Sequence, residues 1–153
     1  MSERDEDVAK LIEAARAAMG NAHAPYSRFA VGAAVRLIDG SIVTGCNFEN
    51  ASYGLSLCAE TVALATVNAQ GRFGDIAAIA VVGGAMDVAD EALVTPCGRC
   101  RQIMNEAEQM AGRAVAIYCA TPSGSQVNEF CITDLLPHAF GPTDLGITPI
   151  RKS

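Results

Sequence analysis

The sequence predicts an α/β fold, a three-layer α/β/α arrangement around a mixed sheet of about five strands. Helix-type and strand-type segments alternate along most of the chain. Two β-rich runs within residues 29–48 meet at Asp39-Gly40, a dipeptide that favours a hairpin turn and therefore an antiparallel pair. A continuous apolar run at residues 76–84 is typical of a buried strand. Helices that follow strands then indicate a sheet covered on both faces.

The first predicted helix lies within residues 3–21, and Gly20-Asn21 follows as a stop. Its apolar residues fall on one helical stripe: Val8, Leu11, Ile12, Ala15 and Met19. The hairpin comes next and leads through a polar loop into a second helix, which runs from Cys58 to about Ala69.

Beyond the buried strand, a third helix is predicted from Cys97 to about Met110, with Pro96 ahead of it and Gly112 near its end. Two further strands are predicted within residues 114–120 and 126–132, and a short capped helical turn at 133–137. The sequence contains no internal repeat and no low-complexity linker. We therefore expect residues 1–153 to form a single domain.

Composition narrows the class of protein. Half of the residues are hydrophobic, which argues against disorder, and the net charge of −6 argues against a nucleic-acid partner. A small-molecule partner is the expectation. No apolar stretch is long enough for a membrane span, and the first ten residues are charged where a signal peptide would be apolar. These features predict a cytoplasmic protein without a membrane partner.

Six cysteines in a reducing compartment are better explained by metal binding, catalysis or packing than by disulfides. Cys46, Cys119 and Cys131 fall in or beside predicted strands, where we expect packing roles. Cys97-Gly98-Arg99-Cys100 is a CxxC motif, which by itself fits a metal site, a redox pair or a structural role. The two histidines, His23 and His138, have no ligand spacing, and we assign neither a catalytic role.

Cys58 adds a third sulfur at another predicted helix start. A small apolar residue at a helix start, with Glu60 as an acidic residue of the first turn, is the ordinary interpretation of this segment. Three sulfurs on one zinc ion would instead leave an open coordination position, which is typical of catalytic zinc. Glu60 could then carry a proton of the water at that position.

Cys58-Ala59-Glu60 followed by Pro96-Cys97-Gly98-Arg99-Cys100 resembles the zinc-dependent cytidine deaminases, whose signature includes a Cys₃ variant. The resemblance extends to residues 24–34 (APYSRFAVGAA), 45–60 (GCNFENASYGLSLCAE), 96–102 (PCGRCRQ) and 135–142 (LLPHAFGP). It implies a cytidine deaminase-like fold of the homotetrameric type. PCGRCRQ is also similar to the matching segment of blasticidin S deaminase.

The resemblance implies a reaction as well. Cys58, Cys97 and Cys100 would bind Zn²⁺ as thiolates, and a zinc-bound hydroxide would add to C4 of the pyrimidine. Glu60 would take the proton of the water, protonate N3 and help ammonia to leave. Cytidine or 2′-deoxycytidine would become the uridine product in pyrimidine salvage, with no organic cofactor.

The family pattern also implies the residues that contact substrate: Phe29 on the pyrimidine ring, Ala59 beside it, Asn47 and Glu49 on the ribose hydroxyls, and Tyr53 and Phe140 across subunit interfaces of a homotetramer. Taken alone, Asn47 and Glu49 are polar loop residues and Phe29 is a strand residue facing the core.

One position departs from the pattern. Many homotetrameric relatives have arginine after the catalytic glutamate, whereas this chain has Thr61. The charges of three thiolates and one Zn²⁺ ion sum to −1. The metal is therefore a weaker Lewis acid unless a positive charge lies nearby. We hypothesise that Arg99 supplies it through a hydrogen bond to a zinc thiolate; a solvent-facing Arg99 is the alternative.

Two other functions remain open at this stage. An antibiotic or base-modified nucleoside, as in blasticidin S deaminase, could be the substrate. A protein of another class, with a CxxC redox pair or a structural zinc site, would share the cysteine motif but would not deaminate nucleosides.

Overall fold

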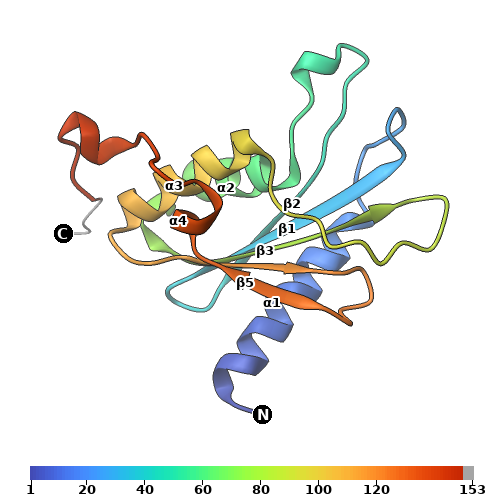
Figure 1. Ribbon diagram of the computed structural model, residues 1–153, viewed down its shortest axis with the longest axis horizontal. Helices are drawn as coiled ribbons and strands as arrows, with labels where there is room; N and C mark the ends of the chain where they lie inside the picture. Colours follow the sequence, from blue (N-terminus) through green and yellow to red (C-terminus); the bar gives the residue numbers. More distant parts are fainter. Residues whose placement is uncertain (150–153) are drawn as a thin grey trace.

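The computed structural model describes residues 1–149 and contains a mixed five-stranded sheet in the order β2-β1-β3-β4-β5 (Figure 1). Its strands are β1 (Phe29–Leu37), β2 (Ile42–Cys46), β3 (Ile76–Ala85), β4 (Ala116–Ala120) and β5 (Val127–Phe130). β3 and β4 run parallel, and the other neighbouring pairs are antiparallel. The predicted strands and the 39–40 hairpin are confirmed.

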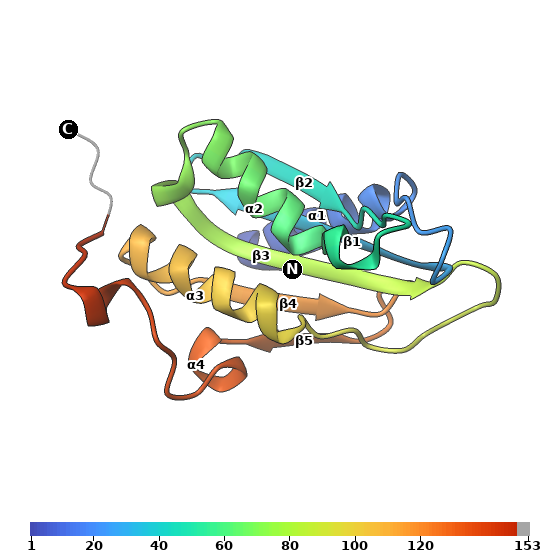
Figure 2. The same cartoon turned by 90° about the horizontal axis from the view of Figure 1, so that it is seen from above.

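Helices cover both faces of the sheet (Figure 2). The first, α1 (Glu3–Met19), packs alone on one face, where its buried residues meet alternate residues of β1, β3 and β4. The second, α2 (Ala59–Ala69), and the third, α3 (Gly98–Ala111), lie side by side on the opposite face, together with α4 (Ile132–Leu135). The three-layer α/β/α prediction is therefore confirmed.

The largest apolar core lies between the sheet and the α2–α3 layer. β3 is the central strand, and eight of its ten residues are buried, as its continuous apolar sequence requires. Short 3₁₀ turns at Tyr53–Leu55, Phe73–Asp75 and Pro142–Leu145 occupy the connections. No helix within residues 1–149 has the length and apolar character needed to cross a bilayer.

Two glycines bring the helices unusually close to the sheet. A Cβ atom at Gly45 of β2 would lie 2.5 Å from the backbone nitrogen of Ala63 and 2.7 Å from the carbonyl oxygen of Ala59. A Cβ atom at Gly32 of β1 would lie 1.9 Å from the carbonyl oxygen of Ala15 on the other face. Gly45 thus sets the depth at which α2 rests on the sheet.

The C-terminal part corrects two expectations. The short helical turn begins at Ile132, one residue before the predicted segment, and Cys131 precedes it without a side-chain capping hydrogen bond. Cys131 is also exposed rather than packed, and its sulfur contacts the Asp134 carboxylate at 2.8 Å. β5 is an edge strand whose residues alternate between exposed and half-buried. Cys119 is buried and Cys46 half-buried, in agreement with packing roles.

Candidate active site

The structure brings three cysteine sulfurs together where two helices begin. Cys58 is the N-cap residue of α2, Cys97 is the N-cap residue of α3, and Cys100 lies in the first turn of α3. The Sγ atoms of all three lie within 4.8 Å of one another, and those of Cys58 and Cys97 are 3.8 Å apart. Both helices begin at the end of the sheet where β3 and β4 terminate (Figure 2). Ligand sites of open α/β sheets occupy this edge.

The cluster fits a zinc ion. Tetrahedral zinc has Zn–S bonds of about 2.3 Å, which places neighbouring ligand sulfurs about 3.8 Å apart. The Cys58–Cys97 separation matches this spacing. Three thiolates are a soft donor set that suits zinc, and the N-terminal ends of α2 and α3 stabilise negative charge at the cluster.

The thiols of Cys58 and Cys100 interact and hold their protons unequally. Interaction with the Cys100 thiol lowers the pKa of Cys58 to about 6, and the same interaction with Cys58 raises the pKa of Cys100. The Cys58 thiol therefore loses its proton more readily than the Cys100 thiol. A metal ion that binds as a thiolate complex displaces such protons, so its affinity depends on pH.

Glu60 lies immediately beside the sulfurs in the first turn of α2 and is only 4% exposed. Burial raises the pKa of its carboxyl group above the usual value, because the charged form loses hydration. A carboxyl group whose pKa is raised toward neutrality can both accept and donate a proton near pH 7.

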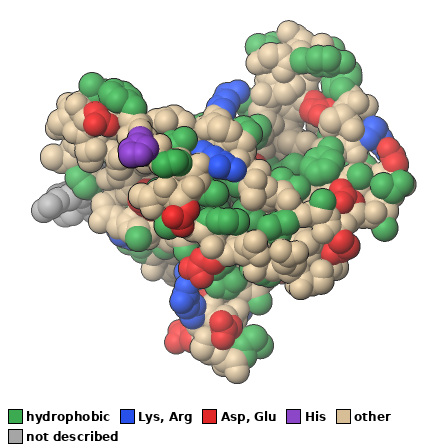
Figure 3. Space-filling view, viewed as in Figure 1, with side chains coloured by type: hydrophobic (Ala, Val, Ile, Leu, Met, Phe, Trp, Pro, Cys, Tyr) green, Lys and Arg blue, Asp and Glu red, His purple; other side chains and the backbone are tan. Residues whose placement is uncertain are grey.

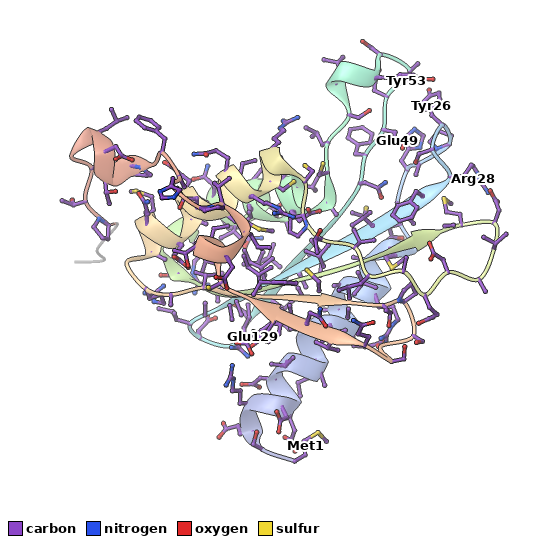
Figure 4. All side chains as sticks on the ribbon, viewed as in Figure 1. Met1, Tyr26, Arg28, Glu49, Tyr53 and Glu129 are labelled. Carbon is purple, nitrogen blue, oxygen red and sulfur yellow. The ribbon has the colours of Figure 1, made fainter. Side chains whose placement is uncertain are left out.

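A pocket of about 250 Å³ opens onto this cluster. Its wall includes Cys58, Ala59, Glu60 and Cys97, together with Asn47, Glu49 and apolar residues of β1 and the segment before α3. A second hollow of about 320 Å³ adjoins it through Glu49 and Ser56, which line both. Tyr26 and Tyr53 flank the outer hollow with ring centroids 5.6 Å apart, and Figure 4 shows them beside Glu49.

Asn47 lines the pocket but also holds the sheet together. Its amide oxygen accepts a hydrogen bond from the backbone N–H of Val31 at 2.9 Å, and its amide nitrogen donates to the carbonyl of Phe29 at 2.8 Å. The polar-loop interpretation is therefore incomplete, because the side chain adds hydrogen bonds to the β1 backbone directly after β2 ends.

Glu49 also forms hydrogen bonds with the backbone. One of its carboxylate oxygens accepts the backbone N–H groups of Tyr26 at 3.0 Å and Ser27 at 3.1 Å, and its pKa lies below the usual range, chiefly because of the hydrogen bond from Ser27. This carboxylate is therefore ionised and fixed at the rim shared by the two hollows.

The remaining residues predicted to contact substrate differ in burial and in their position relative to the pocket. Ala59 is fully buried and lines the pocket, whereas half-buried Phe29 stands next to that wall without being part of it. Tyr53 is 74% exposed on an arm that projects from the sheet, and hydrophobic side chains gather at the tip of this arm (Figures 1 and 3). Phe140 is 62% exposed and lies outside the pocket of its own chain.

The Arg99 hypothesis is not reflected in the geometry. Arg99 is exposed, and within residues 1–149 its guanidinium makes no hydrogen bond to a cysteine sulfur. Its charge acts on Cys58 only through space and is the smallest of the influences on that pKa. The solvent-facing alternative describes its position.

Two residues near the cluster make contacts that the sequence did not predict. Arg101 donates to the carbonyl oxygens of Pro96 at 2.7 Å and Leu135 at 2.8 Å, and so ties the segment before Cys97 to α4. The hydroxyl of Thr61 lies 3.5 Å from the Cys100 sulfur. For Thr61 the sequence signal was its departure from the family pattern, and for Arg101 it was a place in the PCGRCRQ segment directly after Cys100.

Three convergent thiols, a buried glutamate two residues after the first of them, and an adjoining pocket on an α/β sheet define a protein of the zinc deaminase class. Comparison with known proteins agrees. The family model described as the cytidine and deoxycytidylate deaminase zinc-binding region matches residues 5–117. The chain belongs to this family.

Several relatives match over most of their length. A cytidine deaminase of Halalkalibacterium halodurans is 42% identical over 135 residues, which are 88% of this chain and 95% of that protein. A cytidine deaminase of Mycobacterium tuberculosis is 45% identical over 132 residues, 86% of this chain and 87% of that protein. The crystal structure of cytidine deaminase from Burkholderia pseudomallei superimposes with a TM-score of 0.74 at 42% identity, covering 92% of this chain and all of that one.

Proposed function

We propose that this protein hydrolytically deaminates cytidine or 2′-deoxycytidine to the uridine product and ammonia. The observation that carries the proposal is the buried carboxyl group of Glu60 beside three convergent sulfurs at the wall of the pocket. Membership of the family and the names of the close relatives support the same reaction.

Cys58, Cys97 and Cys100 hold the metal in this proposal. When bound, Zn²⁺ acts as a Lewis acid that lowers the pKa of a water molecule toward neutrality. Cys97 is exposed and Cys100 is buried, so the cluster has one side toward the pocket and one toward the core.

Glu60 moves the protons. Its carboxylate accepts a proton from water as the water oxygen forms a bond to C4, and it delivers this proton to N3 of the pyrimidine. It then carries the second water proton to the amino nitrogen as the bond between C4 and that nitrogen breaks, and ammonia leaves. The raised pKa of Glu60 suits a group that must accept and return protons at the same pH.

The two adjoining hollows suggest how a nucleoside lies. We place the pyrimidine in the inner pocket against Ala59 and Glu60, with Phe29 behind the wall, and the sugar toward Glu49 at the shared rim. Glu49 has a fixed, ionised carboxylate, which suits a hydroxyl donor of the sugar. Asn47 has one amide N–H left for a sugar hydroxyl after its two bonds to β1.

We further propose a homotetramer that works in the cytoplasm as a single-domain enzyme. Large apolar residues are exposed on the arm and at the C-terminal segment, namely Phe48, Tyr53, Leu55 and Phe140. Such exposure is typical of interaction surfaces. Light scattering of the purified chain tests the tetramer.

Metal analysis together with an ultraviolet assay on a nucleoside panel tests the function. The panel contains cytidine, 2′-deoxycytidine, cytosine, a C5-substituted cytidine and blasticidin S. We expect one zinc per chain and loss of cytidine absorbance with release of ammonia. A zinc-loaded protein that leaves both plain nucleosides intact would refute the proposal, and turnover of blasticidin S alone would establish the antibiotic alternative.

A further inference from the structure

Thr61 makes the one side-chain hydroxyl contact with the metal-binding cysteines in residues 1–149. Its Oγ1 lies 3.5 Å from the Sγ of Cys100, within the range for a hydrogen bond to sulfur. Thr61 sits in the first turn of α2, three residues after the N-cap Cys58, so its hydroxyl comes from the helix that also carries Glu60. It does not line the substrate pocket.

The environment of Cys100 makes this contact consequential. Cys100 is fully buried, whereas Cys97 is exposed and Cys58 half-buried. A thiolate at Cys100 therefore lacks water to solvate it. Within residues 1–149 Arg99 makes no hydrogen bond to this sulfur, whereas the Thr61 hydroxyl lies within hydrogen-bonding distance of it.

The direction of the hydrogen bond follows from chemistry. A metal-bound cysteine is a thiolate and has no proton to give, so the Thr61 hydroxyl must be the donor. A donor to a ligand sulfur withdraws electron density from the metal–sulfur bond. The metal consequently keeps more of its positive charge and becomes a stronger Lewis acid.

We propose that Thr61 is a positioning residue that hydrogen-bonds the Cys100 thiolate and, as a neutral donor, partly offsets the negative charge of the three-cysteine zinc site. This inference rests on the proposed function only for its catalytic consequence. The hydrogen bond itself concerns the metal site and can be measured without any substrate.

The test is the near-ultraviolet spectrum of the full-length protein loaded with Co²⁺ in place of zinc. Sulfur-to-cobalt charge-transfer bands move to longer wavelength when a thiolate becomes more electron-rich. We expect this displacement in Thr61→Val and in Thr61→Ala, and we expect Thr61→Ser, which retains the hydroxyl, to keep the wild-type band. Agreement between the valine and alanine variants excludes a packing fault of either side chain.

Thr66→Val is the matched control, because it makes the same substitution in the same helix. Thr66 donates its hydroxyl to the carbonyl oxygen of Val62 at 2.7 Å, and within residues 1–149 it makes no hydrogen bond to a cysteine sulfur. Its cobalt spectrum should equal that of the wild type.

In the zinc-loaded enzyme, Thr61→Val should lower kcat about tenfold with KM unchanged. The free energy of one hydrogen bond to a charged group corresponds to a change in rate of about this size.

The outcomes separate the two proposals. Cobalt bands of Thr61→Val and Thr61→Ala that coincide with those of the wild type and Thr66→Val would overturn the inference about Thr61. A displaced band in the two variants, together with a zinc-loaded wild-type protein that leaves both cytidine and 2′-deoxycytidine unchanged, would support the hydrogen bond and refute the deaminase function.

Discussion

The sulfur atoms of Cys58 and Cys97 lie 3.8 Å apart although 39 residues separate them along the chain. Each is the residue at which a helix begins, and α2 and α3 begin at the same edge of the sheet (Figure 2). The site is therefore held by the packing of two helices on one sheet, and disturbance of either helix should reach the metal.

Replacing a sulfur of the cluster should abolish metal binding. Cys97→Ser should contain little zinc after dialysis, and its unfolding temperature should no longer respond to a chelator. The wild-type unfolding temperature should fall when zinc is removed, because a ligand that binds only the folded state stabilises it. Cys131→Ser, which lies outside the cluster, is the control and should retain one zinc. A chelator-insensitive wild type would contradict this prediction.

Removing the carboxyl group of Glu60 should separate catalysis from metal binding. Glu60→Ala should keep its zinc and its circular dichroism spectrum but lose turnover by about 10²–10⁴-fold, the usual contribution of general acid–base catalysis. Single-turnover kinetics with zinc-matched samples measure the loss. Turnover near the wild-type rate would eliminate Glu60 as the proton carrier.

A methyl group at Gly45 should lift α2 from the sheet. The added Cβ would meet backbone atoms of Ala59 and Ala63 at 2.7 and 2.5 Å, so Gly45→Ala should cost about 1–3 kcal/mol in urea unfolding and weaken zinc binding. Gly32→Ala crowds α1 on the opposite face and should destabilise the fold without a specific loss of zinc affinity. At Gly54 a Cβ meets nothing within 4 Å, and Gly54→Ala serves as the neutral control. Equal zinc affinity in all three variants would argue that the distance between α2 and the sheet does not affect zinc binding.

The two arginines beside the CxxC motif should behave differently. Arg101→Ala removes hydrogen bonds to the carbonyl oxygens of Pro96 and Leu135, and should cost about 1.5–3 kcal/mol of unfolding free energy. Arg99→Ala changes an exposed side chain and should stay within about 0.5 kcal/mol. Urea unfolding of the two variants measures the difference, and a larger cost for Arg99 would reverse the assignment.

Asp39 should contribute to stability in a defined pH range. Hydrogen bonds from Ser41, and then interaction with Arg72, lower its pKa from 3.8 to about 2. A carboxylate with a lowered pKa stabilises the folded state above its unfolded pKa, and the contribution is lost as pH falls through about 2. The unfolding temperature of Asp39→Asn should be lower than that of the wild type at pH 7 and should converge with it between pH 4 and pH 2. A constant difference across this range would contradict the shift.

Much of the fold followed from local sequence signals. The Asp39-Gly40 turn, the apolar stripe of α1 and the continuous apolar run of β3 each involve residues close together in the chain, and the structure confirms them. Cys131 was expected to be a packing residue but is exposed. Its burial depends on whether another layer covers the edge of the sheet, which local sequence does not encode.

The candidate site also depends partly on local motifs and partly on long-range packing. The residues proposed as metal ligands and proton carrier came from short motifs and a family resemblance, and the structure brings them to one place; their individual roles stay predictions. The position of Asn47 between two strands and of Phe140 outside its own pocket depended on long-range packing.

The sequence alone determined the class of the fold through its periodicity, and it pointed to the cysteine set and the glutamate beside it through short motifs and a family resemblance. Only the tertiary structure decided which neighbour contacts the sulfurs. Arg99 and Arg101 are the same residue type two positions apart on one helix, so they face different directions, and packing turns Arg101 toward the backbone of Pro96 and leaves Arg99 in solvent. Thr61 reaches Cys100 because α2 and α3 lie side by side, a contact between residues 39 positions apart that no local pattern encodes.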